Sequence, residues 1–238
     1  MDEELTATPR PSAPWRALEA IPVAVLALVG AGLVSAGITA ALEANATGLL
    51  LAGLVFEVAL AGTSIAWVHL RYRGALRALG LVSRTPGRDV ASGVVWGVAL
   101  FFGVVVLVAP LVFWLVELFV SGSVQAPRQE VIPADPELAQ IALGAFVVIV
   151  AAPVGEEIFF RGFLYGALRR RLGFGTAAVV SGAAFGAFHV LPLLMPLMFV
   201  VGLGLAAVYE RRGTLIASIA AHGAFNVIGY TFIVLALR

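Results

Sequence analysis

The sequence contains no cysteine and no lysine, and charged residues make up only 12% of its 238 positions. Without cysteine, the chain has no disulfide, no thiolate metal site and no cysteine nucleophile. Without lysine, a Ser–Lys catalytic dyad is excluded as well. Charged residues are about half as frequent as in a typical soluble domain. No basic run is long enough to follow a phosphate backbone, so we expect no nucleic acid partner.

Hydrophobic residues are abundant instead, at 61% of the chain, and the mean hydropathy is +1.02. This composition is typical of a polytopic membrane protein, in which each transmembrane helix needs about 20 apolar residues. The sequence therefore predicts an all-α transmembrane helix bundle in contact with membrane lipid. The seven predicted spans are residues 21–41, 48–69, 90–120, 138–168, 174–190, 192–209 and 214–237. An eighth helix, inserted only halfway into the membrane, fits within residues 71–88.

The arginines indicate how the predicted spans are oriented. They crowd the loops after the second, fourth and sixth spans, whereas the alternate loops hold acidic residues such as Glu43, Glu130 and Asp135, with Arg128 among them, or no charge. The positive-inside rule then predicts a multi-pass protein of the cell membrane with a cytosolic N-terminus and an outside C-terminus. The arginines that decide this are Arg71, Arg73, Arg77, Arg84, Arg88, Arg169, Arg170, Arg171, Arg211 and Arg212.

A small set of polar side chains lies within segments that otherwise read as buried in lipid. A charged group at the centre of a membrane costs about 2.5–3.5 kcal/mol on insertion scales. Such residues are therefore candidates for a functional site. Those in the C-terminal part of the chain, from residue 156 onwards, are Glu156, Glu157, Arg161, His189, His222 and Asn226.

Helix geometry predicts that four of these residues lie at one depth. With a rise of about 1.5 Å per residue, Glu156 is roughly 20 Å from the cytosolic edge and His189 roughly 23 Å. His222 and Asn226 are roughly 15 and 21 Å from the same edge. The four residues come from three different predicted spans, so their common depth favours a single site.

The spacing of the residues also predicts which of them share a helix face. His222 and Asn226 are four residues apart, as are Glu157 and Arg161, for which the acid-first order favours an ion pair. Small residues at four-residue spacing allow helices to approach closely. The two such pairs next to the polar residues are Gly162 with Gly166 and Gly182 with Gly186.

These residue types support two kinds of chemistry. A carboxylate beside an imidazole can take a proton from water and direct the water to a carbonyl carbon. An imidazole and a carboxamide on one helix face can stabilise the resulting oxyanion. The same side chains could instead bind a divalent metal such as zinc through Glu156, His189 and His222. No HExxH helix is present, so the usual single-helix zinc signature is missing.

Three motifs resemble, in order, those of the CPBP family. They are Glu156-Glu157-Ile-Phe-Phe-Arg161, then Phe185-Gly-Ala-Phe-His189, then His222-Gly-Ala-Phe-Asn226, and together they cover about 70 residues. This family contains intramembrane CAAX prenyl endopeptidases and bacteriocin-processing or Abi proteins. The resemblance implies a multi-span endopeptidase with about seven or eight helices around a conical polar cavity in the membrane.

The resemblance also implies a role for each matched residue. Glu156 activates water, His189 assists it, and His222 and Asn226 stabilise the oxyanion. We expect Glu157 and Arg161 to support the site through their ion pair. Family members are described both as metalloproteases and as glutamate peptidases without a metal, so the cofactor stays open, with a slight preference for none.

The implied organisation is one membrane domain over residues 20–238. Residues 1–19 are expected to be a disordered cytosolic tail, since they lack the basic start of a signal peptide. Residues 20–137 form N-terminal membrane helices, and residues 138–238 form the catalytic core. Glu57 is alone in the second predicted span, where it is either a protonated, hydrogen-bonded carboxyl or a lining group of the same cavity.

The predicted substrate is a peptide or protein that is membrane-associated or lipid-modified. One alternative is a family member that acts as a scaffold or bacteriocin-immunity protein without cleaving anything. A third, disfavoured alternative is a proton- or ion-coupled transporter, because no internal repeat of the kind found in such transporters is evident.

Overall fold

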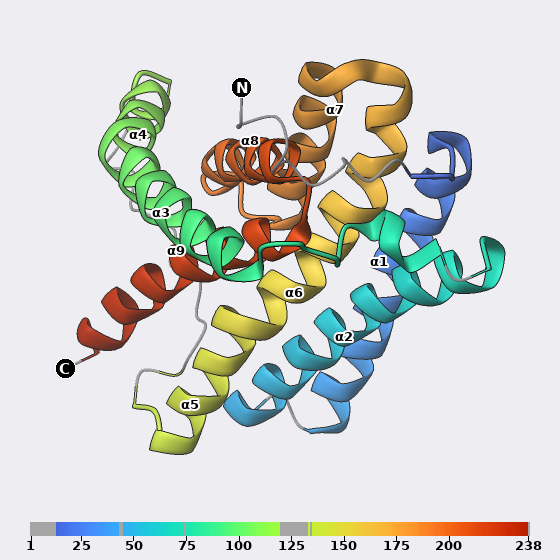
Figure 1. Cartoon of the computed structure of the whole chain (residues 1–238). Coiled ribbons are helices and arrows are strands. Elements are labelled where there is room, and N and C mark those ends of the chain that lie inside the picture. Colours follow the sequence, from blue (N-terminus) through green and yellow to red (C-terminus); the bar gives the residue numbers. More distant parts are fainter. Residues whose placement is uncertain (1–12, 43–44, 74, 120–132, 134, 238) are drawn as a thin grey trace.

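The computed structural model describes residues 13–42, 45–73, 75–119, 133 and 135–237, and within these every regular element is a helix (Figure 1). This confirms the predicted all-α bundle. The helices are α1 (Ala17–Ala41), α2 (Ala46–Arg71), α3 (Pro86–Gly103), α4 (Ala109–Glu117), α5 (Leu138–Phe146), α6 (Ala152–Glu156), α7 (Gly166–Phe188), α8 (Met195–Arg212) and α9 (Leu215–Leu235). A short 3₁₀ helix, η1 (Ala75–Leu79), and the π-helical segments η2 (Val104–Val108), η3 (Val147–Ala151) and η4 (Glu157–Tyr165) lie between them.

Five helical stretches in the described part are long and apolar enough to cross a membrane, in agreement with a multi-pass protein. The prediction has seven spans. Two of them, residues 138–168 and 174–190, are counted here as the single stretch Leu138–Phe188, and the break predicted between them lies at Gly173, whose φ of 72° suits glycine. The helix α8 ends on three charged residues, Glu210, Arg211 and Arg212, which make it less apolar than the five spans.

Two of the π-helical segments accommodate prolines within long helices. A proline ring clashes with the carbonyl four residues earlier and lacks the N–H that would bond to it. For Pro110 and Pro153 that carbonyl belongs to Val106 and Ile149, which are the central residues of η2 and η3. The irregularity expected at Pro153 and Gly155 therefore takes the form of widened helical turns on both sides of α6.

Glycines bring the helices that carry the site into close contact. A Cβ atom on Gly93 or Gly97 of α3 would lie 2.3 or 2.1 Å from backbone oxygens of α9, so α3 and α9 pack backbone to backbone. Gly182 and Gly186 of α7 contact α8 in the same way, as their spacing predicts. The expected close approach at Gly162 is made to the Leu79 carbonyl oxygen of η1.

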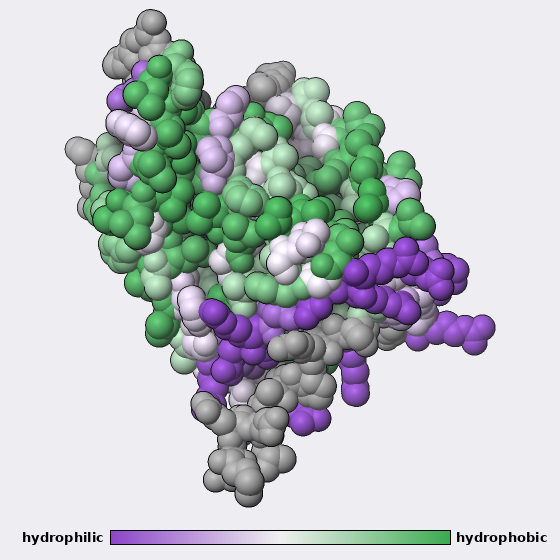
Figure 2. Space-filling model, turned by 90° about the horizontal axis from the view of Figure 1, so that it is seen from above, coloured by the Kyte–Doolittle hydropathy of each residue, from purple (hydrophilic) through white to green (hydrophobic). Residues whose placement is uncertain are grey.

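Ion pairs join the ends of several helices. Tyr165 donates a hydrogen bond of 2.6 Å to Glu210, which also pairs with Arg169 at 2.8 Å. Arg212 donates to Asp89 at 2.8 Å and thereby joins the end of α8 to the start of α3. Figure 2 shows hydrophilic side chains gathered along one edge of the molecule, whereas most of the visible surface is hydrophobic.

The boundary expected at residue 19 lies inside α1, which begins at Ala17. Trp15 is already fully buried, and its indole N–H donates a hydrogen bond of 2.9 Å to the Phe163 carbonyl in η4. Residues 13–19 are therefore part of the folded bundle. Residues 1–12 of the expected tail, and the loop residues Glu43, Arg128 and Glu130, lie outside the described residues.

The close packing of α3 on α9 predicts the effect of an alanine at Gly97. The new Cβ would overlap the Ala221 carbonyl oxygen, which cannot move without shifting α9, so we expect Gly97→Ala to destabilise the fold by about 1–3 kcal/mol. Gly103→Ala is the matched control in the same helix, because no atom lies within 4 Å of its added Cβ. Thermal unfolding in detergent measures both variants. Equal midpoints for the two would contradict the packing.

Candidate active site

Glu156 and Glu157 lie at the junction of α6 and η4, in the interior of the bundle. The exposed fraction of Glu156 is 6%, and Glu157 is fully buried. All nine residues of the π-helical segment that follows Glu156 are buried too. π-Helical turns are uncommon and often occur at functional sites. Both carboxylates thus lie in the buried interior of the protein.

The buried carboxylate of Glu157 forms an ion pair with Arg161, as their spacing predicts. Arg161 Nη1 lies 2.6 Å from Glu157 Oε1, and both side chains are fully buried. Arg161 Nη2 also donates to the carbonyl of Gly202 at 3.2 Å, and its guanidinium lies 4.3 Å from the centre of the Phe185 ring. Such a cation–π contact is strongest where water is excluded. Arg161 therefore links η4 to α7 and α8.

His222 extends from α9 to both carboxylates. Its Nδ1 lies 3.2 Å from Glu157 Oε1, and its Nε2 lies 3.9 Å from Glu156 Oε2. Since an ionised carboxylate only accepts hydrogen bonds, Nδ1–H is the donor to Glu157. This bond fixes the orientation of the ring and directs Nε2 towards Glu156. An acid and an imidazole from two predicted spans are thus adjacent.

Asn226 lies one helical turn beyond His222 and is half-buried. Its amide nitrogen donates a hydrogen bond of 2.7 Å to the Val148 carbonyl in the π-helical segment η3. The carboxamide nitrogen carries a second N–H, which this hydrogen bond does not use. The contact holds α9 against the helix that carries Glu156.

His189 immediately follows the end of α7 and is half-buried. Its Nδ1 lies 2.9 Å from the Phe185 carbonyl oxygen, so this nitrogen carries a proton and Nε2 accepts in the neutral ring. The rings of His189 and His222 lie 5.0 and 5.7 Å from the Phe185 ring. Within the described part of the chain, no ion pair joins His189 to Glu156, so the expected partnership of these two residues stays a prediction.

Two residues at the site were not assigned to it from the sequence. Phe185 begins the second motif but was given no role there, and it contacts Arg161, His189 and His222. Glu57 of α2 is 7% exposed and packs against Gly155, directly before Glu156. The sequence left its role open because nothing in α2 indicates which neighbouring helix it faces.

The described residues contain no group of three or more histidine, aspartate or glutamate side chains arranged to bind a metal ion. Glu156 and His222 are adjacent, but His189 forms no ion pair with either residue in the described part of the chain and does not complete a group of three with them. This donor set does not fit the three-ligand sites of zinc enzymes. We therefore assign no catalytic step to a metal.

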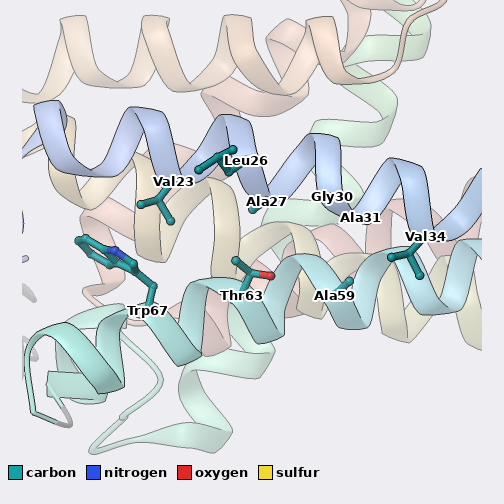
Figure 3. A pocket seen from close by; sticks show the side chains of 9 residues that line it. All are labelled: Val23, Leu26, Ala27, Gly30, Ala31, Val34, Ala59, Thr63 and Trp67. Carbon is teal, nitrogen blue, oxygen red and sulfur yellow. The ribbon is translucent and has the colours of Figure 1, made fainter.

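A groove of about 400 Å³ lies apart from these residues, between α1 and α2 (Figure 3). It is lined mainly by apolar side chains, among them Val23, Leu26, Val34 and Trp67, with the Thr63 hydroxyl as a polar exception. Figure 3 shows these side chains pointing between the two helices. None of the predicted site residues lines it.

Comparison with known families gives one match. Residues 138–228 match the family model of the type II CAAX prenyl endopeptidase Rce1-like proteins. No curated protein and no solved structure gives a match. The family match supports the assignment to the CPBP or CAAX protease family that the motifs predict. The matched segment contains Glu156, Glu157, Arg161, His189, His222 and Asn226.

The buried ion pair predicts a large cost for removing Arg161. Arg161→Met would leave the Glu157 carboxylate without its guanidinium partner in the interior, which costs about 3–5 kcal/mol. Arg171→Met is the control, because Arg171 is exposed. Chemical unfolding in detergent gives both stabilities. If the two variants lose the same amount, Arg161 does not hold a buried charge in place.

Proposed function

We propose that this chain, whose residues 138–228 fall within the Rce1-like CAAX protease family, is an intramembrane endopeptidase. The observation that carries the proposal is the cluster of Glu156, Glu157 and His222, in which two carboxylates from one helix meet an imidazole from another inside the bundle. A hydrolase needs a base that can activate water in a site of low polarity. Glu156 has the environment for that role.

In the proposed reaction, Glu156 takes a proton from a water molecule, and the water oxygen attacks the carbonyl carbon of the scissile peptide bond. The carbonyl oxygen becomes an oxyanion in the tetrahedral intermediate. Glu156 then gives the proton to the leaving nitrogen as the C–N bond breaks. Glu156 Oε2 is buried and has no hydrogen-bond partner among the described residues, so it is available for a water or substrate.

His222 and Asn226 are proposed to stabilise the oxyanion. Because Nδ1–H of His222 is already donated to Glu157, the ring takes part as an imidazolium, whose Nε2–H is the donor to the oxyanion. Donors that are fixed before the reaction are effective because no reorganisation is needed when charge develops. The Glu157 carboxylate fixes the His222 ring through Nδ1, much as the aspartate of a serine protease triad orients its histidine. The bond from Asn226 to Val148 fixes the carboxamide on the same face of α9.

His189 is proposed to assist the water-activating step. The Nδ1–H bond to the Phe185 carbonyl holds its ring, which leaves Nε2 as the acceptor. A water could then contact Nε2 while Glu156 takes its proton. The half-buried position of His189 beyond the end of α7 is consistent with a residue that the substrate can approach.

The proposed substrate is a peptide segment of a membrane-associated or lipid-modified protein, cleaved near the cytosolic side. In line with the arginine pattern, the segment after α2, the break at Gly173 within α7 and the end of α8 are proposed to lie on that side, with the N-terminus in the cytosol. A CAAX-type peptide is the first substrate to test, because the matching family contains CAAX prenyl endopeptidases.

The direct test is cleavage by the purified protein in lipid vesicles. Its probes are a prenylated and an unprenylated CAAX-type peptide, each with a fluorophore and a quencher on opposite sides of the scissile bond. Because an amide cannot act as the base, Glu156→Gln should lower the cleavage rate by about 10²–10⁴-fold. Glu117→Gln, which changes an exposed glutamate of α4, should cleave as the unaltered protein does.

Cleavage that continues unchanged in Glu156→Gln would overturn the assigned mechanism. A cellular effect of the protein that survives the same substitution would favour the non-cleaving scaffold or immunity protein instead. Substrate-dependent uptake into the vesicles, without cleavage, would favour the transporter.

A further inference from the structure

Glu57 is a third carboxyl group at the site, contributed by a helix outside the segment that matches the protease family. It lies in the middle of α2, and its exposed fraction is 7%. Its Oε2 atom is buried and has no hydrogen-bond partner among the described residues. A buried polar atom without a partner is costly, so one that is retained requires an explanation.

The position of Glu57 is fixed by its contact with Gly155. A Cβ on Gly155 would lie 2.5 Å from Glu57 Oε2 and 2.8 Å from the Glu57 backbone oxygen, so only glycine leaves room for this side chain. Gly155 directly precedes Glu156, so the Glu57 carboxyl lies next to the backbone that carries the proposed base. The Oε2 atoms of both residues are buried and unpartnered in the described part of the chain.

The balance of charge shows which carboxyl must be neutral. Glu157 is paired with Arg161, and His222 lies between Glu157 and Glu156. No cation in the described structure forms an ion pair with Glu57. An isolated carboxylate in an apolar interior is so unfavourable that it takes up a proton instead. A second negative charge next to Glu156 would add repulsion to that cost.

We propose that Glu57 is a neutral carboxylic acid that donates a hydrogen bond to Glu156, directly or through the attacking water, and so positions the catalytic carboxylate. The role as a positioning residue rests on the proposed function, because it concerns the same reaction. The neutral state of Glu57 does not depend on that function. The donor satisfies the free oxygen of Glu156, and a neutral group avoids a second buried negative charge.

Two substitutions separate this role from packing. Glu57→Gln keeps the size and a hydrogen-bond donor, whereas Glu57→Leu keeps the approximate volume and removes every polar atom. Replacing a buried polar group by an apolar group of similar shape is often neutral for stability. We therefore expect Glu57→Leu to unfold at about the same temperature as the unaltered protein while losing activity.

The first experiment measures the infrared absorption of the whole protein in lipid vesicles at neutral pH, without substrate. The expected result is a C=O band of a protonated carboxylic acid that disappears in Glu57→Gln and persists in Glu117→Gln. Absence of the band from the unaltered protein would overturn the proposal. Loss of the band in Glu156→Gln but not in Glu57→Gln would overturn it too, because the proton would then reside on Glu156.

The second experiment compares steady-state cleavage of the CAAX-type peptide. Misplacement of a catalytic group can cost on the order of 10²-fold in rate, so Glu57→Leu should lower kcat by about that factor with little change in KM. Glu57→Gln should lower kcat much less than Glu57→Leu. A kcat for Glu57→Gln as low as that of Glu156→Gln would show that Glu57 acts as an ionised base, and an unchanged kcat for Glu57→Leu would exclude positioning.

The two experiments distinguish a failure of the proposed function from a failure of the role assigned to Glu57. If Glu156→Gln leaves cleavage unchanged, the proposed function is wrong, but the infrared band still decides whether Glu57 is neutral. If Glu156→Gln abolishes cleavage and the Glu57 variants behave otherwise than expected, the proposed function stands and the role of Glu57 is wrong.

Discussion

Burying charge in an apolar bundle is the constraint on which the rest of the structure depends. Glu157 and Arg161 are fully buried, and each would be prohibitively unfavourable there without the other. Their pairing also explains the arrangement around them. Arg161 contacts the Gly202 carbonyl and the Phe185 ring, and the shared Glu157 oxygen orients His222. The ion pair thus determines where the imidazole lies relative to Glu156.

The backbone around the site is adapted to this cluster. The widened turns of η3 and η4 enclose α6, so the helix that carries Glu156 departs from regular α-helical geometry on both sides. Gly97 allows the backbone of α3 to contact Ala221, next to His222, and Gly155 makes room for Glu57. Close contacts of this kind leave little freedom for the polar side chains to separate. The surrounding bundle therefore maintains an arrangement that the polar groups alone would not.

Much of this could be predicted from the sequence, for reasons that differ between elements. Hydropathy was sufficient for the all-α bundle, and four-residue spacing was sufficient for the ion pair of Glu157 with Arg161. Spacing along a helix does not indicate how one helix is rotated against another. The sequence therefore could not show that His222 lies beside both Glu156 and Glu157, or that Glu57 faces Gly155. The break at Gly173 agrees with the predicted gap between residues 168 and 174, whereas the charged end of α8 explains why this helix is not among the five most apolar stretches.

The central claim is that Glu157 and His222 form one buried unit across two helices, and a double-mutant cycle tests it most directly. The cycle compares the unfolding free energies of Glu157→Gln, His222→Gln and the double variant in detergent. Groups in one hydrogen-bonded network are coupled by about 0.5–3 kcal/mol, so the account predicts a coupling energy in that range. Effects that add to within about 0.3–0.5 kcal/mol would show that the two side chains are independent, and would contradict the account.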